Sequence, residues 1–275
     1  MINAPTLWKE GYTGDGVVVA ILDTGCDYDH DDLKENIIYG CNFTSDYNSN
    51  TKNFYDNNGH GTHIAGIIGA KNNIGVAPSS KLLILKTLNK YGKGNYKDLI
   101  NAIKFCINWT GPNKERVRVI SISAGLEYNS IQLHNIIRKA IKNNIVIVCS
   151  AGNMGDGKLS TIERQYPAIY NEVIQVGAID NNYKVADFSN TNPEVDIVAP
   201  GIKITSTFLN NTYASFSGTS MAAPYVSGAI ALLICKYEEY RKEKLIYSQI
   251  LELLYKHTKL IVHDNVKYKV LDFNA

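Results

Sequence analysis

Short apolar segments rich in β-branched residues alternate with segments of helical periodicity along most of this chain. The strand-like segments, each without a polar face, are residues 17–23, 81–87, 117–123, 145–149, 173–176 and 195–198. The helical segments are residues 62–70, 98–109, 131–143 and 220–240. A strand without a polar face must be covered on both sides, as in a parallel sheet between two layers of helices. The alternation therefore predicts a three-layer α/β fold whose sheet is mostly parallel.

The length and composition fit one large domain. Of the 275 residues, 45% are hydrophobic and 20% are charged, so a core of domain size can form. No linker separates two cores, and we expect residues 1–275 to form a single domain. The formal net charge of +2 excludes an overall polycation, and we expect no nucleic-acid partner.

Neither a targeting segment nor a membrane span is predicted. Residues 1–16 lack the apolar stretch of a signal peptide, and the longest apolar runs, such as residues 229–235, are too short to cross a bilayer. The five cysteines are odd in number and none forms a C-x-x-C pair, so we expect buried, reduced thiols. These features favour a cytoplasmic protein without a membrane partner.

The first of three polar clusters is Asp23-Thr24-Gly25, directly after the apolar residues 17–22. A carboxylate at the end of a buried strand is costly unless a hydrogen-bonding partner such as an imidazole compensates it. The alternative is that Asp23 only caps the next turn. Asp23 is therefore a candidate for a chemical role that needs a partner elsewhere in the chain.

The second cluster is Gly59-His60-Gly61-Thr62-His63. Glycines on both sides of His60 allow a sharp turn and leave its imidazole uncrowded. The two histidines could share a helix face as metal ligands, but the H-E-x-x-H motif needs a spacing of four and a glutamate. We therefore assign no metal here, and we interpret His63 as a core residue hydrogen-bonded to the backbone.

The third cluster, residues 217–224, opens the long helical segment with Ser220. A serine in this place is often only an N-cap. The same place suits a nucleophile, because the helix dipole stabilises developing negative charge. The small residues Gly218, Ala222 and Ala223 leave room for a substrate backbone.

In chain order the three clusters give Asp, His and Ser, which is the subtilisin order of the catalytic triad. A fourth polar segment, Ser150-Ala151-Gly152-Asn153, follows the strand-like residues 145–149. An Asn amide on such a strand-end loop can donate a hydrogen bond to a developing oxyanion.

The chain resembles the subtilisin-like serine peptidases from about residue 7 to about residue 240. The motifs that carry the resemblance are Asp23-Thr24-Gly25, Gly59-His60-Gly61-Thr62-His63-Ile64-Ala65-Gly66, Ala151-Gly152-Asn153 and Gly218-Thr219-Ser220-Met221-Ala222-Ala223-Pro224. The resemblance implies the subtilisin-like α/β fold. Residues 241–275 lack the family's motifs, and their amphipathic, Tyr- and Lys-rich sequence predicts a C-terminal helix and strand extension. The resemblance also implies a serine endopeptidase whose chemistry needs no cofactor.

The resemblance assigns a role to each of the four chemical residues. Ser220 would attack the scissile carbonyl, and His60 would take its proton and later deliver it to the leaving amine. Asp23 would hold the imidazole tautomer and stabilise the imidazolium. Asn153, with the backbone N–H of Ser220, would bind the oxyanion.

The same resemblance places an extended polypeptide substrate between two backbone edges. One edge lies at residues 121–125 and lines the first specificity pocket, the other lies at residues 92–96, and Gln165 resembles the pocket floor with Met154 at the rim. The substrate-binding residues so implied are Gly92, Gly94, Ser123, Ala124, Gly125, Ala151, Gly152 and Gln165. Backbone pairing of this kind gives affinity with little sequence preference, which suits a broad endopeptidase.

Within the family, the chain looks most similar to the intracellular subtilisins, for example in Asp23-Thr24-Gly25-Cys26-Asp27 and Asn42-Phe43-Thr44. This branch implies a cytoplasmic, calcium-stabilised enzyme and a possible homodimer. Asp32 matches the family's calcium carboxylate, but residues 71–78 form a shorter loop than the one that supplies carbonyl ligands. A structural calcium ion is therefore left open, and no metal ligand is assigned.

Two other functions stay open as alternatives, and a third is disfavoured. A narrow processing peptidase, for example one that trims a leader peptide, would keep the chemistry, and a catalytically silent binding protein would keep only the fold. Residues 152–159 nearly match the phosphate-binding pattern G-x-x-x-x-G-K-[ST], but Leu159 stands where the hydroxyl is needed. This mismatch disfavours a nucleotide enzyme.

Overall fold

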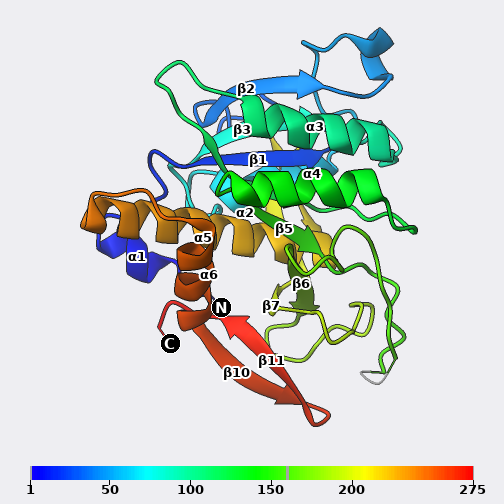
Figure 1. Ribbon diagram of the computed structural model, residues 1–275, viewed down its shortest axis with the longest axis vertical. Helices are drawn as coiled ribbons and strands as arrows, with labels where there is room; N and C mark the ends of the chain where they lie inside the picture. The colour runs from blue at the N-terminus through cyan, green and yellow to red at the C-terminus, as the bar shows by residue number, and fades with distance from the viewer. Residues whose placement is uncertain (1, 159–160, 275) are drawn as a thin grey trace.

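A nine-stranded sheet runs through the computed structural model, which describes residues 2–158 and 161–274 (Figure 1). Its strands lie in the order β10-β11-β7-β6-β5-β4-β1-β3-β2, and neighbouring strands are parallel except β10 and β11. The strands that match predicted segments are β1 (Val18–Asp23), β3 (Lys81–Lys86), β4 (Val117–Ile122), β5 (Val146–Ser150), β6 (Ile174–Ile179) and β7 (Ile197–Pro200). The predicted, mostly parallel sheet is confirmed.

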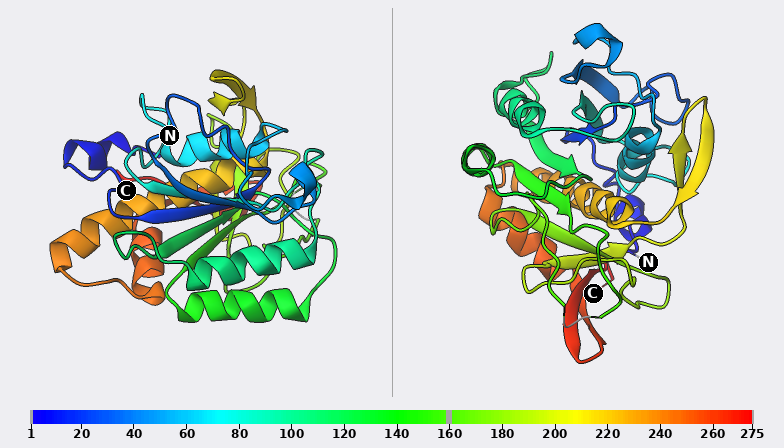
Figure 2. Two further views of the ribbon diagram at one scale, coloured as in Figure 1. Left: turned by 90° about the horizontal axis from the view of Figure 1, so that it is seen from above. Right: turned by 90° about the vertical axis from the view of Figure 1, so that its right-hand side faces the viewer.

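Helices cover both faces of the sheet, as predicted (Figure 2). On one face lie α2 (His60–Gly69) and α5 (Thr219–Arg241), and on the other lie α3 (Tyr96–Asn108) and α4 (Ile131–Lys142). Alternate residues of each central strand enter one core or the other, which is why these strands have no polar face. The helix α2 begins two residues earlier than predicted, so His60 is its first residue.

Several elements had no clear sequence signal. These are α1 (Pro5–Lys9), the 3-10 helix η1 (Asp46–Ser49) and the strands β2 (Ile37–Asn42), β8 (Ile204–Phe208) and β9 (Thr212–Phe216). The predicted C-terminal helix and strand are in fact a helix and a hairpin, α6 (Tyr247–Lys256), β10 (Thr258–His263) and β11 (Val266–Leu271). Such peripheral strands are partly exposed, so they lack the continuous apolar pattern of the central strands.

The strand order reverses beside β1, and this reversal fixes where a ligand can bind. The chain passes from β1 to β2 and β3 on one side, and then returns to place β4 and the later strands on the other side. Loops after β1 and β4 therefore leave the sheet in different directions. In open α/β sheets the crevice at the carboxyl ends of such strands is the expected binding site.

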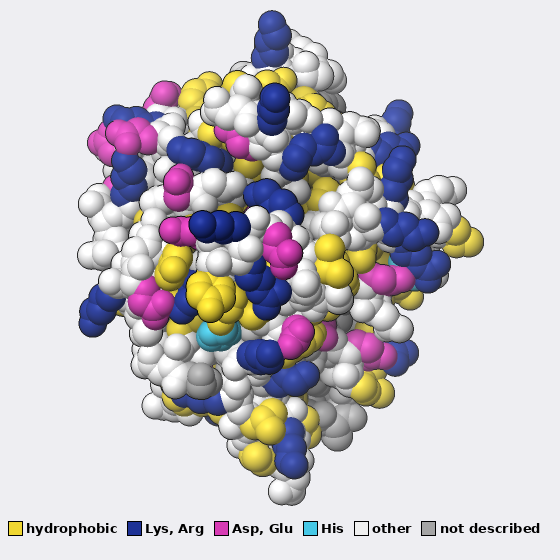
Figure 3. Space-filling view, turned by 60° about the vertical axis from the view of Figure 1, so that its left-hand side comes forward, with side chains coloured by type: hydrophobic (Ala, Val, Ile, Leu, Met, Phe, Trp, Pro, Cys, Tyr) yellow, Lys and Arg dark blue, Asp and Glu magenta, His cyan; other side chains and the backbone are white. Residues whose placement is uncertain are grey.

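The helix α5 is long and apolar enough to span a membrane by length and composition alone, although polar residues interrupt its apolar runs in the sequence. In the fold, 78% of its most apolar window is buried, so the apolar composition is that of a central core helix. The five cysteines are free thiols, three buried and two half-buried. On the face shown in Figure 3, basic and acidic side chains are intermixed.

His63 joins α2 to the small β8–β9 hairpin. Its ring is fully buried, and Nε2 lies 3.1 Å from the carbonyl oxygens of both Ile204 and Ala214. The prediction of a core histidine bonded to the backbone is therefore confirmed. Burial lowers the pKa of His63 to about 4. The hydrogen bonds to the two carbonyl oxygens act in the opposite direction, because they favour the charged ring, but they are outweighed.

This shift predicts an acid-sensitive fold. A histidine in the unfolded chain titrates near 6.5. Between about pH 6.5 and pH 4, His63 is therefore mostly protonated in the unfolded chain and mostly neutral in the folded protein. The free energy of unfolding should fall as the pH drops from about 6.5 to about 4, by up to about 1.4 kcal/mol per pH unit from this residue. Urea unfolding across that range should show a shallower pH dependence for His63→Gln than for the parent. Equal slopes would contradict this assignment.

Candidate active site

Asp23 is the last residue of β1 and is almost fully buried. Its Oδ1 accepts a hydrogen bond of 2.7 Å from the backbone N–H of Thr24 and lies 2.7 Å from Nδ1 of His60. Among the described residues, no donor reaches the buried Oδ2. The imidazole is thus the side-chain partner that the sequence required for this carboxylate.

The start of α2 is built to bring His60 against the β1 loop. The backbone N–H of Gly61 donates to Oγ1 of Thr24 at 2.8 Å. A Cβ atom on Gly61 would lie only 2.2 Å from the carbonyl oxygen of Gly25, so a larger residue would push the helix away. The glycine that follows His60 is therefore needed for close approach.

Asp56, which the sequence reading missed, fixes the same helix end. Its buried carboxylate accepts hydrogen bonds from the backbone N–H groups of Asn58, Gly59 and Thr62, and from the Thr62 hydroxyl, at 2.7–3.0 Å. A carboxylate at a helix N-terminus satisfies free N–H groups and interacts favourably with the helix dipole. The sequence did contain a signal for this role, since an Asp three residues before Gly59 is close enough to accept hydrogen bonds from the helix start.

The electrostatics of His60 combine two opposed effects. Burial favours the neutral ring, but the charge and hydrogen bond of Asp23, together with the charge of Asp56, outweigh it. The pKa of His60 is therefore raised above its ordinary value of 6.5. A raised pKa makes the imidazole a stronger base.

Ser220 is the second residue of α5, behind the N-cap Gly218, so Ser220 is not the N-cap of this helix. Its hydroxyl donates to the carbonyl oxygen of Ser123 at 3.1 Å, and no bond from it to His60 is formed in this conformation of the described residues. In return, the Ser123 hydroxyl donates to the carbonyl oxygen of Ser220 at 3.0 Å. That carbonyl is free because Pro224, four residues on, has no N–H.

Asn153 presents its amide group beside Ser220. Its Oδ1 accepts hydrogen bonds from the backbone N–H and the hydroxyl of Thr219, at 2.8 and 3.0 Å. A backbone N–H can only donate, so the oxygen must face Thr219 and the NH₂ group is left to donate elsewhere. Asn153, His60 and Ser220 line one cavity of about 340 Å³, with Asp23 behind the imidazole.

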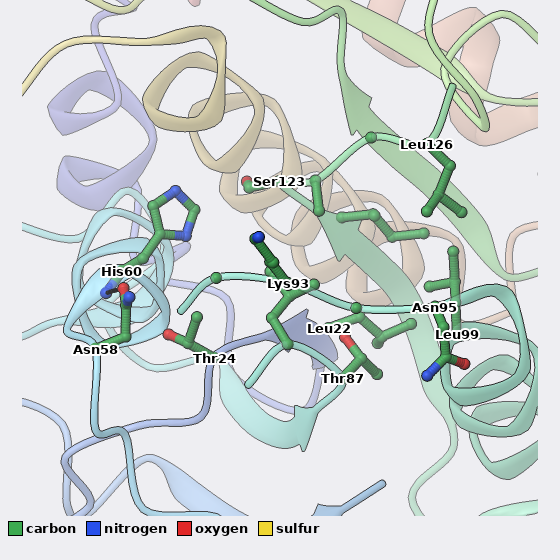
Figure 4. Close-up of a pocket in the computed structure, with 16 residues that line it drawn as sticks. Leu22, Thr24, Asn58, His60, Thr87, Lys93, Asn95, Leu99, Ser123 and Leu126 are labelled. Atoms are coloured by element: carbon green, nitrogen blue, oxygen red, sulfur yellow. Dashed lines mark hydrogen bonds between the residues drawn. The ribbon is translucent and has the colours of Figure 1, made fainter. Parts of the chain in front are cut away.

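A second cavity of about 440 Å³ begins at His60 and runs between the two predicted backbone edges (Figure 4). Gly92 and Gly94 lie on one side of it. The other side is formed by Ser123, Ala124 and Gly125. The structure thus brings five of the predicted substrate-binding residues together around one cleft, which we call the main cleft.

The three remaining predicted residues lie beside the main cleft rather than in its lining. Ala151 is buried, and the Gln165 side chain fills the space between Gly125 and Gly152. A Cβ atom on Gly125 or Gly152 would lie 1.9 or 2.4 Å from atoms of the Gln165 side chain. Gln165 therefore packs against both backbone segments. The side chain of Met154, which was predicted at the pocket rim, is exposed.

Lys86 is a second residue that the sequence reading missed. It is fully buried at the end of β3, and its ammonium donates to the carbonyl oxygens of Thr24 and Leu88, at 2.6 and 3.1 Å. It also donates to Oδ1 of Asn57 at 3.0 Å and pairs with the carboxylate of Asp46 at 3.1 Å. Lys86 thus joins three loops and the helix η1 beside the site. The sequence signal for this role was a lysine at the end of an apolar strand, because a buried ammonium needs hydrogen-bond acceptors around it.

The residues present do not fit a calcium site centred on Asp32. One carboxylate oxygen accepts a hydrogen bond from Asn72 at 2.5 Å, and the other accepts one from the Tyr213 hydroxyl at 2.7 Å. A cation would have to displace both donors. Within residues 2–158 and 161–274, no group of three or more His, Cys, Asp or Glu side chains could hold a metal ion.

The phosphate-loop alternative gains no structural support. Leu159, on which the pattern failed, lies outside the described residues. The preceding Lys158 is exposed, with its ammonium 3.9 Å from Asp156. Residues 161–165 form no helix, so this segment offers no helix N-terminus to a phosphate.

Together, the parallel sheet and the Asp, His and Ser side chains at its carboxyl edge define a serine peptidase of the subtilisin class. Comparison with known proteins gives the family directly. The model of the subtilase family matches residues 14–272, and the chain belongs to this family.

Named relatives cover most of the chain. An intracellular serine protease of Paenibacillus polymyxa is 46% identical over 260 residues, which are 92% of this chain and 78% of that protein. The major intracellular serine protease of Bacillus subtilis strain 168 is 44% identical over 263 residues, 94% of this chain and 81% of that protein. Subtilisin E of the same organism is 41% identical over 241 residues, 86% of this chain and 60% of that protein.

The network around Lys86 makes a stability prediction. Lys86→Met removes the charge but keeps a long unbranched side chain. It leaves the Asp46 carboxylate without its ion-pair partner and the carbonyl oxygens of Thr24 and Leu88 without the Lys86 donor. We expect the free energy of unfolding to fall by about 3 kcal/mol, as when one partner of a buried ion pair is removed. Urea denaturation measures this loss. Lys81→Met, at the half-buried start of the same strand, is the matched control, and an equal effect of both variants would contradict the prediction.

Proposed function

We propose that this subtilase is a serine endopeptidase that hydrolyses peptide bonds through Asp23, His60 and Ser220, with an acyl-enzyme intermediate. The observation that carries the proposal is the 2.7 Å bond from buried Asp23 to His60, behind a cavity that His60 shares with Ser220 and Asn153. A buried carboxylate, a basic imidazole and a hydroxyl at a helix N-terminus are the parts that acyl transfer requires.

The proton path follows from the imidazole orientation. Because Nδ1 faces the Asp23 carboxylate, Nδ1 carries the hydrogen and Nε2 is free to act as the base. The Ser220 hydroxyl turns from the Ser123 carbonyl towards Nε2 when it reacts, a rearrangement that resting enzymes commonly need. His60 then passes the proton to the leaving amine, while Asp23 stays ionised and stabilises the imidazolium.

The tetrahedral intermediate places a negative charge beside the start of α5. Ser220 lies in the first turn of this helix, where backbone N–H groups have no intrahelical acceptor. The Ser220 N–H and the free NH₂ group of Asn153 would donate to the oxyanion. The helix dipole adds a favourable field at the same point.

The substrate is a polypeptide held in extended form in the main cleft, between the edges at Gly92 and Gly94 and at Ser123 to Gly125. Pairing through backbone groups supports broad intracellular proteolysis, and the names of the relatives support a cytoplasmic location. The chemistry draws on protein groups alone and needs no cofactor. A homodimer and a structural calcium ion away from Asp32 stay proposals, as do the narrower processing peptidase and the silent binder.

The oxyanion role of Asn153 predicts a defect in kcat. Asn153→Ala should lower kcat on a fluorogenic peptide by about 10²–10³-fold with little change in KM, a magnitude taken from the corresponding side chain of a subtilisin. Ser220→Ala supplies the background rate on the peptide and on casein. A fluorophosphonate should label the parent and Asn153→Ala but not Ser220→Ala. Parent-like kcat in Asn153→Ala would contradict the oxyanion role, and a folded but unlabelled parent would favour the silent binder.

The raised pKa of His60 predicts the acid limb of the pH profile. His60 must be neutral to accept the proton, so kcat/KM should rise with pH through a midpoint above 6.5. In Asp23→Asn the charge that raises this pKa is lost, so the midpoint should move to lower pH while the plateau falls by about 10⁴-fold. Measuring kcat/KM of both proteins from about pH 5 to 9 tests this, and an unmoved midpoint would refute the electrostatic role of Asp23.

A further inference from the structure

Lys93 stands in the wall of the main cleft on a well-defined turn. The backbone N–H of Lys93 donates to Oδ1 of Asn89 at 3.2 Å, and the Asn89 N–H donates to the carbonyl oxygen of Lys93 at 2.9 Å. The flanking Gly92 adopts a positive φ of 69°, which turns the chain there. The turn holds the Lys93 backbone against the cleft while its long side chain extends from it.

The Lys93 side chain lies between the two ends of the cleft. Figure 4 shows it between His60 at one end and Leu99 and Leu126 at the other, with its ammonium towards Ser123 on the opposite edge. A peptide that pairs with both edges must pass this ammonium. Lys93 is therefore placed to contact a substrate side chain rather than only solvent.

The charge of Lys93 is uncompensated where a substrate would lie. Of the sixteen residues that line the main cleft, none is Asp or Glu, and Lys93 is the one Lys or Arg. In the described part of the chain, no carboxylate lies within ion-pair distance of its ammonium, whereas Lys34, Lys71, Lys86 and Lys236 each have such a partner. Asp98, in the adjoining hollow, is instead hydrogen-bonded to Asn95.

We propose that Lys93 makes this enzyme prefer peptides with an acidic side chain in the segment held between the two edges. Apolar side chains of Leu22, Leu88 and Leu99 line the same cleft, and a bound peptide excludes water from it, so the attraction between opposite charges is strengthened. An aspartate or glutamate of the substrate would supply the missing partner. A lysine or arginine there would be repelled.

This inference rests on the proposed function and adds a substrate class to it. Backbone pairing with the two edges would hold any extended peptide, whereas Lys93 would select among sequences. The selection is electrostatic, so it should weaken as the ionic strength rises, because salt screens partly exposed charges. A contribution from shape alone would not change with salt.

The test is a set of fluorogenic peptides with one cleavage site and Glu, Gln or Lys at each flanking position in turn. For the parent, we expect one or two adjacent positions at which kcat/KM for Glu exceeds that for Gln by about three- to tenfold, with Lys below Gln. Lys93→Gln should remove this difference, and Lys93→Glu should reverse it. Fluorophosphonate labelling of Ser220 shows that each variant is folded and competent.

Lys90→Gln is the matched control. Lys90 belongs to the same loop, but its ammonium lies 5.0 Å from the centre of the Tyr91 ring, and it does not line the main cleft. The preference for Glu should persist in this variant. Loss of the preference in Lys90→Gln would show a diffuse effect of loop charge and would overturn the role of Lys93.

The remaining outcomes separate this inference from the proposed function. If the parent cleaves the peptides but Glu and Gln are equal at every position, the enzyme is an endopeptidase and the role of Lys93 is refuted. A preference that survives in Lys93→Gln refutes it as well. If the parent is no more active than Ser220→Ala on any peptide, the proposed function itself fails.

Discussion

The candidate active site depends on the hydrogen bonds that stabilise one buried carboxylate, that of Asp23. Asp23 ends a strand in which every residue is buried, and an ionised group there is tolerated only with strong partners. His60 is the side-chain partner, and it reaches Asp23 because α2 begins directly against the β1 loop. That contact needs the small Gly61, and the helix start needs the carboxylate of Asp56. The Asp23–His60 contact thus depends on the way α2 packs on the sheet.

Two buried charged groups outside the triad hold the surrounding loops. Asp56 fixes the loop before α2, and Lys86 joins the loops at Thr24, Asn57 and Leu88 with the carboxylate of Asp46. Such networks are rigid when every member is satisfied, because each unpaired group in a low dielectric would be costly. They hold the loops around the Asp23–His60 contact, including the cleft-lining residues Thr24 and Leu88.

Two further polar side chains lie in or beside the main cleft. Gln165 fills the space between Gly125 and Gly152, and Lys93 brings a positive charge to a cleft without carboxylates. Neither side chain takes part in the proposed proton path. Family membership therefore accounts for the reaction, while Lys93 is the residue that we propose selects among peptides. The same fold can serve different substrates through such changes in its loops.

The sequence alone determined the parallel sheet and the identity of the chemical groups. Central strands buried on both faces show as continuous apolar runs, and the motifs at Asp23, His60, Asn153 and Ser220 carry the resemblance that implies the reaction. Only the tertiary structure revealed the outer strands, the C-terminal hairpin and the partners of Lys86 and Gln165. Exposed strands carry weak periodicity, and contacts such as Lys86 with Thr24 join residues 62 positions apart. Which loops meet across the sheet is decided by packing, which no local pattern records.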